Sequence, residues 1–536
     1  MQATPRPAPA PAPASTPTPA LAPFTAALLP ALVMFTLGLW GLDRGTMWRD
    51  EGTTLDVARR SLPEIWHLVH RVDAVHGLYY VLMHGVLPAH PGEVALRLPS
   101  VVAASAAAAL VAVIGTRLAR PRVGLWAGLL YAVTPLAGHY AQEGRSYALV
   151  AAGAALTTLL LLRAVERSGT AADRPAWSAW CAYAAAATGT ALLHELAALL
   201  LVAHAVTLLV ARVPRPARRG WAVAACATCV LLVPLFVASG GQSAQVAWLV
   251  APDGAAAERL LRAFAGPTRL VLVGQVLLAV VALRPPWSRA GRGTLSLPGL
   301  SLPVVALPLL VVPPAVLLAV SQRWPLYQDR YVLFALAGLP LLVAAGADRV
   351  VRGVGAALRT RPGDPPWPAP RPWLSRGRTA VAAVGAAAVG VTLWWQLPLH
   401  RLDRAVGHDR ENPAGAAAFA AREVRPGEPV LFLPLIARRV SLAYPDSFRG
   451  ARDLALATSP DSSGTLYGVE VNPAELRRRL AVVDRLWVLT EPPALRQAQR
   501  AGRSAEGVKL AVLKREFTPH ATYTVRGATL RLYVRR

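Results

Sequence analysis

Apolar residues recur in long runs over the first three quarters of the chain, and polar residues are largely confined to the short stretches between them. A helix of about 20 apolar residues crosses the hydrocarbon core of a bilayer. By this length rule the sequence predicts an α-helical polytopic membrane protein with about eleven transmembrane helices. The predicted spans lie near residues 24–42, 97–116, 123–140, 147–163, 177–193, 196–210, 221–238, 268–284, 302–320, 331–347 and 379–398.

Two stretches that follow the first run do not fit a span. Residues 76–87 are apolar but too short to cross a bilayer, which predicts a re-entrant or interfacial segment. Residues 56–75 mix apolar side chains with Arg59, Arg60 and Glu64, a pattern typical of an amphipathic helix on the membrane surface.

The pattern changes near residue 400. Short β-like runs at 429–435, 485–491, 509–517 and 522–534, the last turning near Gly527, alternate with helical patterns at 413–424 and 472–483. Such alternation predicts a small α/β domain over 401–536, behind a membrane domain over 21–400. The segment 401–536 contains neither a GxGxxG nor a GKS/T motif, so no nucleotide-binding loop is predicted there. Residues 1–20 form a Pro/Ala tract and are predicted to be a disordered tail.

The formal net charge of +26 would suggest nucleic acid as a partner of a soluble protein. Here the arginines lie mostly in short loops between apolar runs, where they set membrane orientation instead, and we expect no nucleic-acid binding. Basic loops alternate at 117–122, 212–219, 284–292 and 349–378. The positive-inside rule places them and the N-terminus in the cytoplasm of a multi-pass plasma-membrane protein, with the C-terminal domain extracytoplasmic. Arginines in the first outer loop weaken this contrast.

Two adjacent acids, Asp50 and Glu51, follow the first apolar run. A charged carboxylate at the bilayer centre costs about 2.5–3.5 kcal/mol, so the pair is placed where the first span meets water. A solvated loop pair is the alternative interpretation. Acids at a membrane edge beside an aromatic anchor, here Trp48, are candidates for function.

Four further polar groups fall on the same predicted outer face, and each also has a purely structural interpretation. The tyrosines near His76 suit an interfacial belt, and Glu93 and Arg97 have the spacing of a helix-start salt bridge. The remaining groups suit surface anchors. The groups are His76, Tyr80 and His84; Glu93 and Arg97; His139, Gln142, Glu143, Arg145 and Tyr147; and His194 and Glu195 with Gln328, Asp329, Arg330 and Tyr331.

Together these groups suit a transferase that uses a lipid-linked donor. The donor phosphate needs arginine or a bound cation, and an acceptor hydroxyl needs a carboxylate base. The motifs WRDEGTT, HGLYYVLMH, RLPS, YAQEGRSYAL and QDRYVLF-x₅-P, in that order, resemble the integral-membrane GT-C glycosyltransferases, over about residues 25–400. The resemblance points to bacterial relatives of protein O-mannosyltransferases and aminoarabinose transferases.

The resemblance implies transfer of a sugar, mannose-like, from a polyprenyl-phosphate donor to an extracytoplasmic protein, lipid or glycan acceptor, usually with inversion. It implies that Asp50 is the catalytic base, with Glu51 as its acidic neighbour. Glu143 and Arg145 match the second outer motif, where metal or phosphate contacts are expected, and Arg330 is the candidate for the donor phosphate. His76, Tyr80, Arg97 and Tyr147 are further candidates for substrate binding.

A divalent metal ion is compatible with the class, and its candidate ligands are Glu51, Glu143 and His139, although no spacing demands one. Two positions depart from the family pattern: Gly77 replaces a proline and Gly144 the commoner alanine. Two rival classes remain. A transporter or lipid flippase would use the same acids as a substrate pathway, but predicts a mid-span acid and inverted repeats, which the sequence lacks. A non-catalytic scaffold would bind a cell-wall partner through its outer domain.

Overall fold

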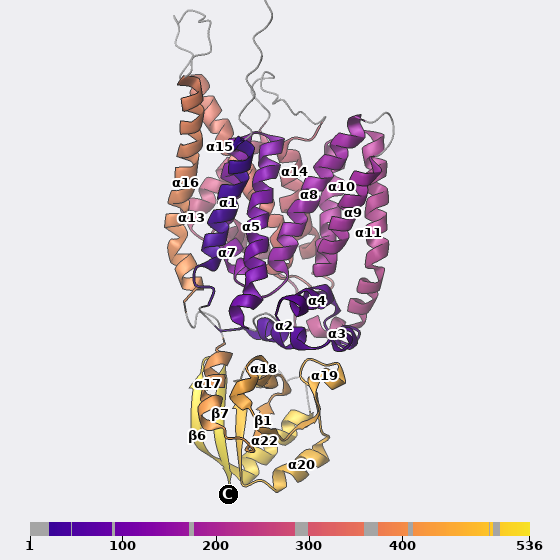
Figure 1. The fold of residues 1–536 in the computed structure, drawn as a ribbon, viewed down its shortest axis with the longest axis vertical. Coiled ribbons are helices and arrows are strands. Elements are labelled where there is room, and N and C mark those ends of the chain that lie inside the picture. The colour runs from indigo at the N-terminus through magenta and orange to yellow at the C-terminus, as the bar shows by residue number, and fades with distance from the viewer. Residues whose placement is uncertain are drawn as a thin grey trace, which may run out of the picture.

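The computed structural model describes residues 21–43, 46–87, 92–170, 176–284, 299–357, 373–405, 411–492, 494–496 and 504–536. Two parts are stacked along the long axis of the molecule: a helical bundle and a smaller α/β domain that contains the C-terminus (Figure 1). The predicted tail 1–20 lies outside the described residues.

Most helices of the bundle run roughly along the long axis (Figure 1). Within the described residues, six are long and apolar enough to cross a membrane, or seven if a pair bent by 92° counts as one span. The larger predicted number of about eleven remains a prediction. The helices are α1 (Leu21–Leu39), α5 (Glu93–Leu118), α6 (Pro121–Val133), α7 (Pro135–Ala141), α8 (Tyr147–Thr170), α9 (Trp177–Leu193), η2 (Glu195–Ala198), α10 (Leu199–Val210), α11 (Arg215–Gly241), η3 (Ser243–Val246), α12 (Ala256–Ala265), α13 (Arg269–Leu283), α14 (Leu302–Val320), η4 (Asp329–Ala337), α15 (Gly338–Ala357) and α16 (Trp373–Asp403).

One predicted span is interrupted at a proline. The run 123–140 is broken between α6 and α7, where Pro135 lacks the N–H that would continue the helix and Thr134 is extended. Small residues then allow close packing of the bundle. A Cβ on Gly124 would lie 2.2 Å from the carbonyl oxygen of Ala112, so α6 approaches α5 only because this position is glycine.

Four short elements lie across the end of the bundle that faces the α/β domain (Figure 1): α2 (Arg49–Arg59), α3 (Leu62–Val69), η1 (Ala74–His76) and α4 (Gly77–Val86). The single amphipathic helix predicted over 56–75 is therefore wrong in detail. The chain breaks after Arg60, and Glu64 accepts the backbone N–H of Ser61 at 2.8 Å to start a second helix. None of the candidate spans of the described chain falls in 76–87.

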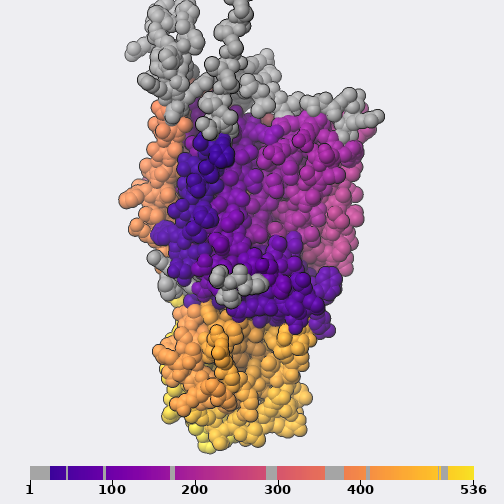
Figure 2. All heavy atoms as spheres, viewed as in Figure 1, coloured from indigo at the N-terminus to yellow at the C-terminus, as the bar shows by residue number. Residues whose placement is uncertain are grey.

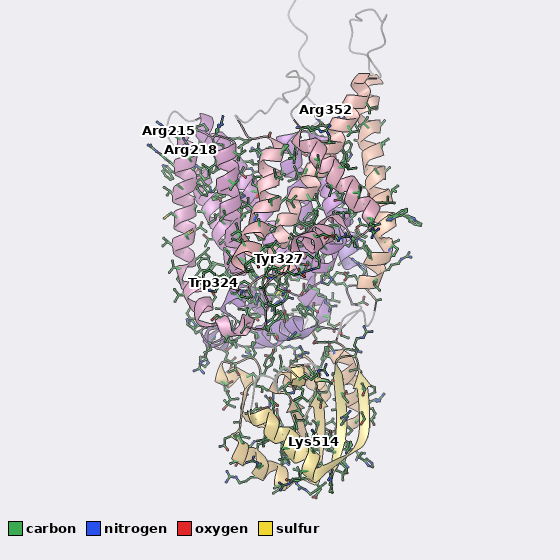
Figure 3. All side chains as sticks on the ribbon, turned by 180° about the vertical axis from the view of Figure 1, so that it is seen from behind. Arg215, Arg218, Trp324, Tyr327, Arg352 and Lys514 are labelled. Carbon is green, nitrogen blue, oxygen red and sulfur yellow. The ribbon has the colours of Figure 1, made fainter. Side chains whose placement is uncertain are left out.

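Basic residues gather at the opposite end of the bundle, where Arg215, Arg218 and Arg352 lie (Figure 3). There Asp348 binds Arg122 at 2.6 Å and Arg352 at 2.9 Å, so two of the predicted basic loops meet. Much of the loops 284–292 and 349–378 lies outside the described residues.

The α/β domain is built on a five-stranded sheet of order β2-β1-β5-β7-β6. β1 is parallel to β2 and β5, whereas β7 is antiparallel to β5 and β6. The strands are β1 (Pro429–Leu433), β2 (Arg452–Asp453), β5 (Arg485–Thr490), β6 (Phe517–Val525) and β7 (Ala528–Arg535), with β3 (Leu456–Thr458) and β4 (Val469–Glu470) in a separate pair. The helices are α17 (Pro413–Glu423), η5 (Leu435–Arg438), α18 (Arg439–Ala443), η6 (Pro445–Phe448), α19 (Pro460–Ser463), α20 (Pro473–Ala481) and α22 (Ser504–Glu516).

Alternate residues of the strands face two apolar layers, as the two-residue repeat of a strand requires. Phe432 and Trp487 pack toward α17, whereas Leu431 and Val488 pack toward α20 and α22. Figure 2 shows the surface of the first-loop helices meeting this domain directly.

Most predicted elements of the domain are confirmed. β1 and β5 occupy the predicted strands, α17 and α20 begin after the capping residues Asn412 and Asn472, and the β6–β7 hairpin turns at Gly527 with φ 85°. The strand predicted over 509–517 is wrong, because residues up to Glu516 are helical and β6 begins at Phe517.

Candidate active site

The acidic pair lies in the first turn of α2, where carboxylates favour the positive end of the helix dipole. Glu51 is buried and forms a two-pronged ion pair with Arg97. Arg97 Nε donates to its Oε1 and Nη2 to its Oε2, both at 2.8 Å. The remaining Arg97 nitrogen, Nη1, donates to the Leu42 carbonyl at 3.0 Å. The Glu93–Arg97 salt bridge that helical spacing allowed is thus replaced by one between Arg97 and α2.

Glu51 also ties α2 to the segment between α7 and α8. Its Oε1 accepts the backbone N–H of Gly144 at 2.7 Å, and its Oε2 accepts that of Trp48 at 3.4 Å. A Cβ on Gly144 would lie 2.5 Å from Leu96 Cγ, so the departure from the family alanine fits a tightly packed turn. Both carboxylate oxygens of Glu51 are therefore engaged within the protein. This geometry suits an anchor for the site, and the catalytic role of Glu51 remains a prediction.

Asp50 is placed differently from its neighbour. Its side chain is 24% exposed, and its Oδ2 lies 3.8 Å from Arg330 Nη2, an ion pair longer than a hydrogen bond. Its backbone carbonyl accepts from Thr54 Oγ1 at 2.9 Å, within the helix. Asp50 is thus accessible and held near a cation while its carboxylate oxygens remain open to a substrate.

Arg330, at the start of η4, lies among aromatic rings. Its guanidinium carbon is 5.4 Å from the ring centre of Trp48, 5.8 Å from that of Tyr147 and 5.6 Å from that of Tyr331. These stacked contacts orient the guanidinium and leave its N–H groups free for other partners. Its Nε is buried and has no hydrogen-bond partner within the part of the chain that the structure describes.

Arg145 is a second buried arginine of the same cluster. Its Nη1 donates to Thr54 Oγ1 at 3.2 Å and to the Asp50 carbonyl at 3.5 Å, which links it to α2. Its Nε, like that of Arg330, lacks a partner among the described residues. Tyr80 also neighbours Arg145 and donates its hydroxyl to Asp73. Two guanidinium groups, each with an unused Nε donor among the described residues, therefore lie near Asp50.

Two histidines complete the buried cluster. The rings of His76 and His194 are 5.8 Å apart, and His194 is 4.7 Å from Tyr331. Burial first, and then the charge of Arg145, lower the pKa of His194 to about 3 and that of His76 well below its usual value. Both are neutral at pH 7, and the Nδ1 atom of each has no partner in the described chain. His84 points elsewhere: its Nδ1 lies 3.0 Å from the Ala58 carbonyl oxygen.

Glu143 lines a cavity of about 400 Å³ beside α2. Its side chain is buried, and its Oε2 has no hydrogen-bond partner among the residues described. Burial raises the pKa of Glu143 to about 7, although His139 and Arg330 oppose this. Such a carboxyl is partly protonated at neutral pH and is suited to exchange a proton.

The same cavity brings together groups from distant parts of the chain. His139 Nδ1 lies 2.7 Å from Asp403 Oδ1, at the end of α16. The walls come from the first loop, α5, the α7–α8 segment, η4, the end of α16 and the start of the α/β domain. They are lined by Gly41, Leu42, Thr46, Trp48, Arg49, Glu51, Arg97, His139, Tyr140, Gln142, Glu143, Arg330, Asp403, Arg404, Ala405 and Glu411.

The site does not fit a metal ion well. In the described parts of the chain no group of three or more His, Cys, Asp or Glu side chains is arranged to hold one. Of the candidate ligands, Glu51 has both oxygens engaged by Arg97 and backbone N–H groups. We therefore derive no chemical step through a metal.

The residues to which the sequence analysis gives a catalytic, substrate-binding or metal-binding role all lie at one end of the bundle, around Asp50 and the cavity. They are Asp50, Glu51, His76, Tyr80, Arg97, His139, Glu143, Arg145, Tyr147 and Arg330. Their individual roles remain predictions. Sequence reasoning missed Thr54, Asp73, Asp403 and Glu411. Asp403 and Glu411 reach the site from segments remote in sequence, whereas Thr54 and Asp73 lie close to predicted residues and carry no pattern that marks them. The sequence predicts Trp48 as an interfacial anchor, and in the structure its ring stacks on Arg330.

Comparison with known proteins identifies the fold. The family model described as dolichyl-phosphate-mannose-protein mannosyltransferase matches residues 79–238. The crystal structure of ArnT from Cupriavidus metallidurans in the apo state is similar with a TM-score of 0.59 and 14% identity, over 94% of this chain and 97% of that one. The fold is that of a GT-C glycosyltransferase.

The structure of the same Cupriavidus metallidurans ArnT bound to undecaprenyl phosphate is similar with a TM-score of 0.56 and 15% identity, again over 94% of this chain and 97% of that one. At these identities the likeness shows the GT-C fold alone. None of the curated proteins matches this chain in sequence.

Proposed function

We propose that this GT-C protein transfers a sugar from a polyprenyl-phosphate donor to a hydroxyl acceptor outside the membrane. One observation carries the proposal. Arg145, Arg330, His76 and His194 converge beside Asp50, and each has a buried nitrogen with no partner among the described residues. Buried polar atoms without partners are costly, and the Nε groups of both arginines are donors, so a ligand that supplies acceptor oxygens is expected there. A phosphate group supplies them, and arginine is its preferred partner.

An apolar groove next to this cluster suits the lipid part of such a donor. It has a volume of about 760 Å³ and is lined by α3, α4 and the end of α11, including Trp66, Val69 and Leu235. Ala74 and Gly77 line the groove, while His76 between them belongs to the polar cluster. A polyprenyl chain in the groove would place its phosphate at the cluster. ArnT, whose fold this chain shares, has been crystallised with undecaprenyl phosphate.

In the proposed reaction the acceptor oxygen attacks the anomeric carbon of the sugar, and the bond from that carbon to the phosphate oxygen breaks. The acceptor proton passes to Asp50, and polyprenyl phosphate leaves. Asp50 is the accessible acid of the pair, as a base requires. Arg145 and Arg330 stabilise the charge that develops on the leaving phosphate, and the Glu51–Arg97 pair keeps α2 in register with them. We further propose a mannose-like sugar, as in the matching family model.

The proposal includes a membrane orientation. With about eleven spans, a cytoplasmic N-terminus and the basic end of the bundle inside, the site and the α/β domain lie outside the plasma membrane. The clustering of Arg122 and Arg352 around Asp348 at the far end supports this orientation.

The decisive variant is Asp50→Asn, which keeps the size of the side chain but replaces the carboxylate by a neutral amide that cannot act as a base. Sugar transfer should fall by about 10²–10⁴-fold, the usual contribution of a general base. Purified protein in nanodiscs would be given a panel of labelled polyprenyl-phosphate sugars, and product formation measured. Asp446→Asn, the same change at an 83% exposed position of the α/β domain, is the matched control. Wild-type turnover by Asp50→Asn would refute the assignment of Asp50.

A further inference from the structure

The α/β domain reaches into the packing of the membrane end through one short helix. Ala443 of α18 belongs to an apolar cluster with Met47 and Leu55 of the first loop and Leu96 of α5, and Tyr444 packs against it. Gly52 of α2 touches this helix so closely that a Cβ there would lie 3.2 Å from Ala443 Cβ. The side of α2 opposite the bundle is therefore in direct contact with the α/β domain.

Tyr444 joins the two parts with its hydroxyl. The hydroxyl donates to Glu93 Oε1 at 3.0 Å, at the start of α5, and accepts the backbone N–H of Met47 at 3.3 Å. Met47 directly precedes Trp48, the residue that stacks on Arg330 and begins α2. One hydroxyl thus links α5, the entry to α2 and the α/β domain.

The helix that carries Tyr444 is itself held firmly. Arg439 of α18 is buried and makes a two-pronged ion pair with Glu491, at the end of β5, with both distances 2.8 Å. Arg439 Nη2 also lies 2.8 Å from Glu411, which lines the cavity of about 400 Å³ beside α2. The carboxyl end of the parallel strands, where many α/β domains bind ligands, is here turned toward α2.

We propose that Tyr444 is a positioning residue: through it, the α/β domain fixes the first turn of α2, so that Asp50 stays beside Arg330 and Trp48 stays in the wall of the cavity. This inference rests on the proposed function for its kinetic consequence only. Among the described residues Tyr444 makes no hydrogen bond to Arg145, Arg330 or the two histidines, so the domain acts more strongly on Asp50 and Trp48 than on phosphate binding.

The test is Tyr444→Phe, which removes the hydroxyl and keeps the ring. Hydrogen–deuterium exchange in nanodiscs should become faster in peptides covering residues 47–59, with exchange in α8 unchanged. The kcat for sugar transfer should fall about tenfold, as loss of a hydrogen bond to a charged group predicts. The affinity for undecaprenyl phosphate should stay within about twofold, because displaced catalytic groups cost rate more than binding.

Glu93 supplies a second arm of the test. Glu93→Gln keeps an oxygen acceptor for Tyr444 and should keep near wild-type kcat, whereas Glu93→Ala should resemble Tyr444→Phe. The double variant Tyr444→Phe with Glu93→Ala should be no slower than the slower single variant, because both break the same link. Tyr533→Phe, on β7 of the same domain, is the control for a general effect on the domain.

The outcomes separate the two proposals. A wild-type protein that neither binds undecaprenyl phosphate nor transfers sugar would refute the proposed function, and the exchange measurement would still decide whether Tyr444 holds α2. Exchange over 47–59 equal to wild type in Tyr444→Phe overturns the positioning role. Faster exchange with unchanged kcat in an active enzyme overturns it as well.

Discussion

Two buried polar clusters lie in the helical bundle, and they differ in whether their hydrogen bonds are complete. In the first, His204 of α10 has its Nδ1 2.9 Å from the Tyr183 hydroxyl and its Nε2 3.1 Å from Thr158 Oγ1. Trp221 Nε1 donates to the same Tyr183 hydroxyl at 3.2 Å. The second is the cluster of Arg145, Arg330 and two histidines beside Asp50.

The hydrogen bonds of the His204 cluster provide a partner for both ring nitrogens. Tyr183 accepts from Trp221 Nε1, and its hydroxyl lies 2.9 Å from His204 Nδ1. Thr158 donates to the Ala154 carbonyl at 2.8 Å, so it accepts from His204 Nε2. Both ring nitrogens of His204 are therefore partnered, and in the neutral imidazole Nε2 donates to Thr158 while Nδ1 accepts from Tyr183. A histidine inside a membrane region is a functional candidate by default, but this one has the contacts of a structural residue.

The cluster beside Asp50 has the opposite character. One buried nitrogen of each arginine and each histidine has no partner in the described chain, although several neighbours are aromatic or acidic. The comparison teaches that burial and residue type do not distinguish a binding site from a structural network. Incomplete hydrogen bonding does, because a ligand is then needed to complete it.

The largest expected difference between the clusters is in ligand binding. Arg330→Gln should weaken binding of undecaprenyl phosphate by about 10–100-fold, the effect of losing hydrogen bonds to a charged group. Its melting temperature should fall only modestly, since Nε has no partner among the described residues and the variant otherwise removes ring contacts and a long ion pair with Asp50. Binding measured by isothermal titration would check this, with exposed Arg323→Gln as the control. Wild-type affinity would remove Arg330 from the phosphate site.

The reverse pattern is expected for His204→Ala. The variant leaves Tyr183 and Thr158 without their partner and should lower the free energy of unfolding by about 1–2 kcal/mol. Turnover per folded molecule should be unchanged, because the cluster lacks unused donors. Thermal unfolding in detergent, paired with kcat, would measure both. A large loss of kcat with normal stability would show that the His204 cluster takes part in function.

A smaller effect is expected from pH. The pKa of Glu143, about 7, is raised above the ordinary carboxyl value, so the group is neutral at pH 6 and ionised at pH 8. Ionisation adds a negative charge near Arg330, Glu51 and Asp50, and should therefore weaken binding of a phosphate several-fold as pH rises through 7. Glu143→Gln should flatten this step in the affinity measured between pH 6 and 8. A step that persists in Glu143→Gln would assign it to another group, such as the phosphate itself.

The smallest effect is expected for Trp221→Phe. It removes one donor at the edge of the His204 network, and Tyr183 keeps its bond to His204. Stability should fall by only about 0.5 kcal/mol, near the average for a hydrogen bond inside a membrane protein. Thermal unfolding beside His204→Ala would rank the two. A loss as large as that of His204→Ala would mean that the network is more cooperative than its pairwise bonds suggest.

Much of this organisation follows from sequence pattern. Runs of apolar residues located the helices, and the acid pair after the first run located α2, because burying charge in a bilayer is costly. The hydrophobic pattern led to a wrong prediction at 509–517, where the structure has a helix up to Glu516 in place of the predicted strand. The buried face of α22 includes Glu506 and Lys509 as well as Val512 and Leu513, and Lys509 pairs with Glu470 at 2.7 Å. A buried helical face that carries paired charges does not show as an apolar repeat.

The partners within the site were beyond sequence reasoning. Arg97 has the spacing to pair with Glu93, yet it pairs with Glu51, because the fold brings α2 against α5. His139 meets Asp403 across 264 positions of sequence. Such pairings depend on tertiary packing, which no local pattern encodes.

The tight contact of Gly144 with Leu96 has a consequence for natural variation. Two positions 48 apart in sequence share one small volume. A homologue with alanine at the position of Gly144 must create space, most simply with a smaller residue at the position of Leu96. The two sites should therefore change together across the superfamily, and an alanine introduced alone would push the backbone N–H away from Glu51. Co-variation of this pair would show that evolution has preserved the turn rather than either side chain.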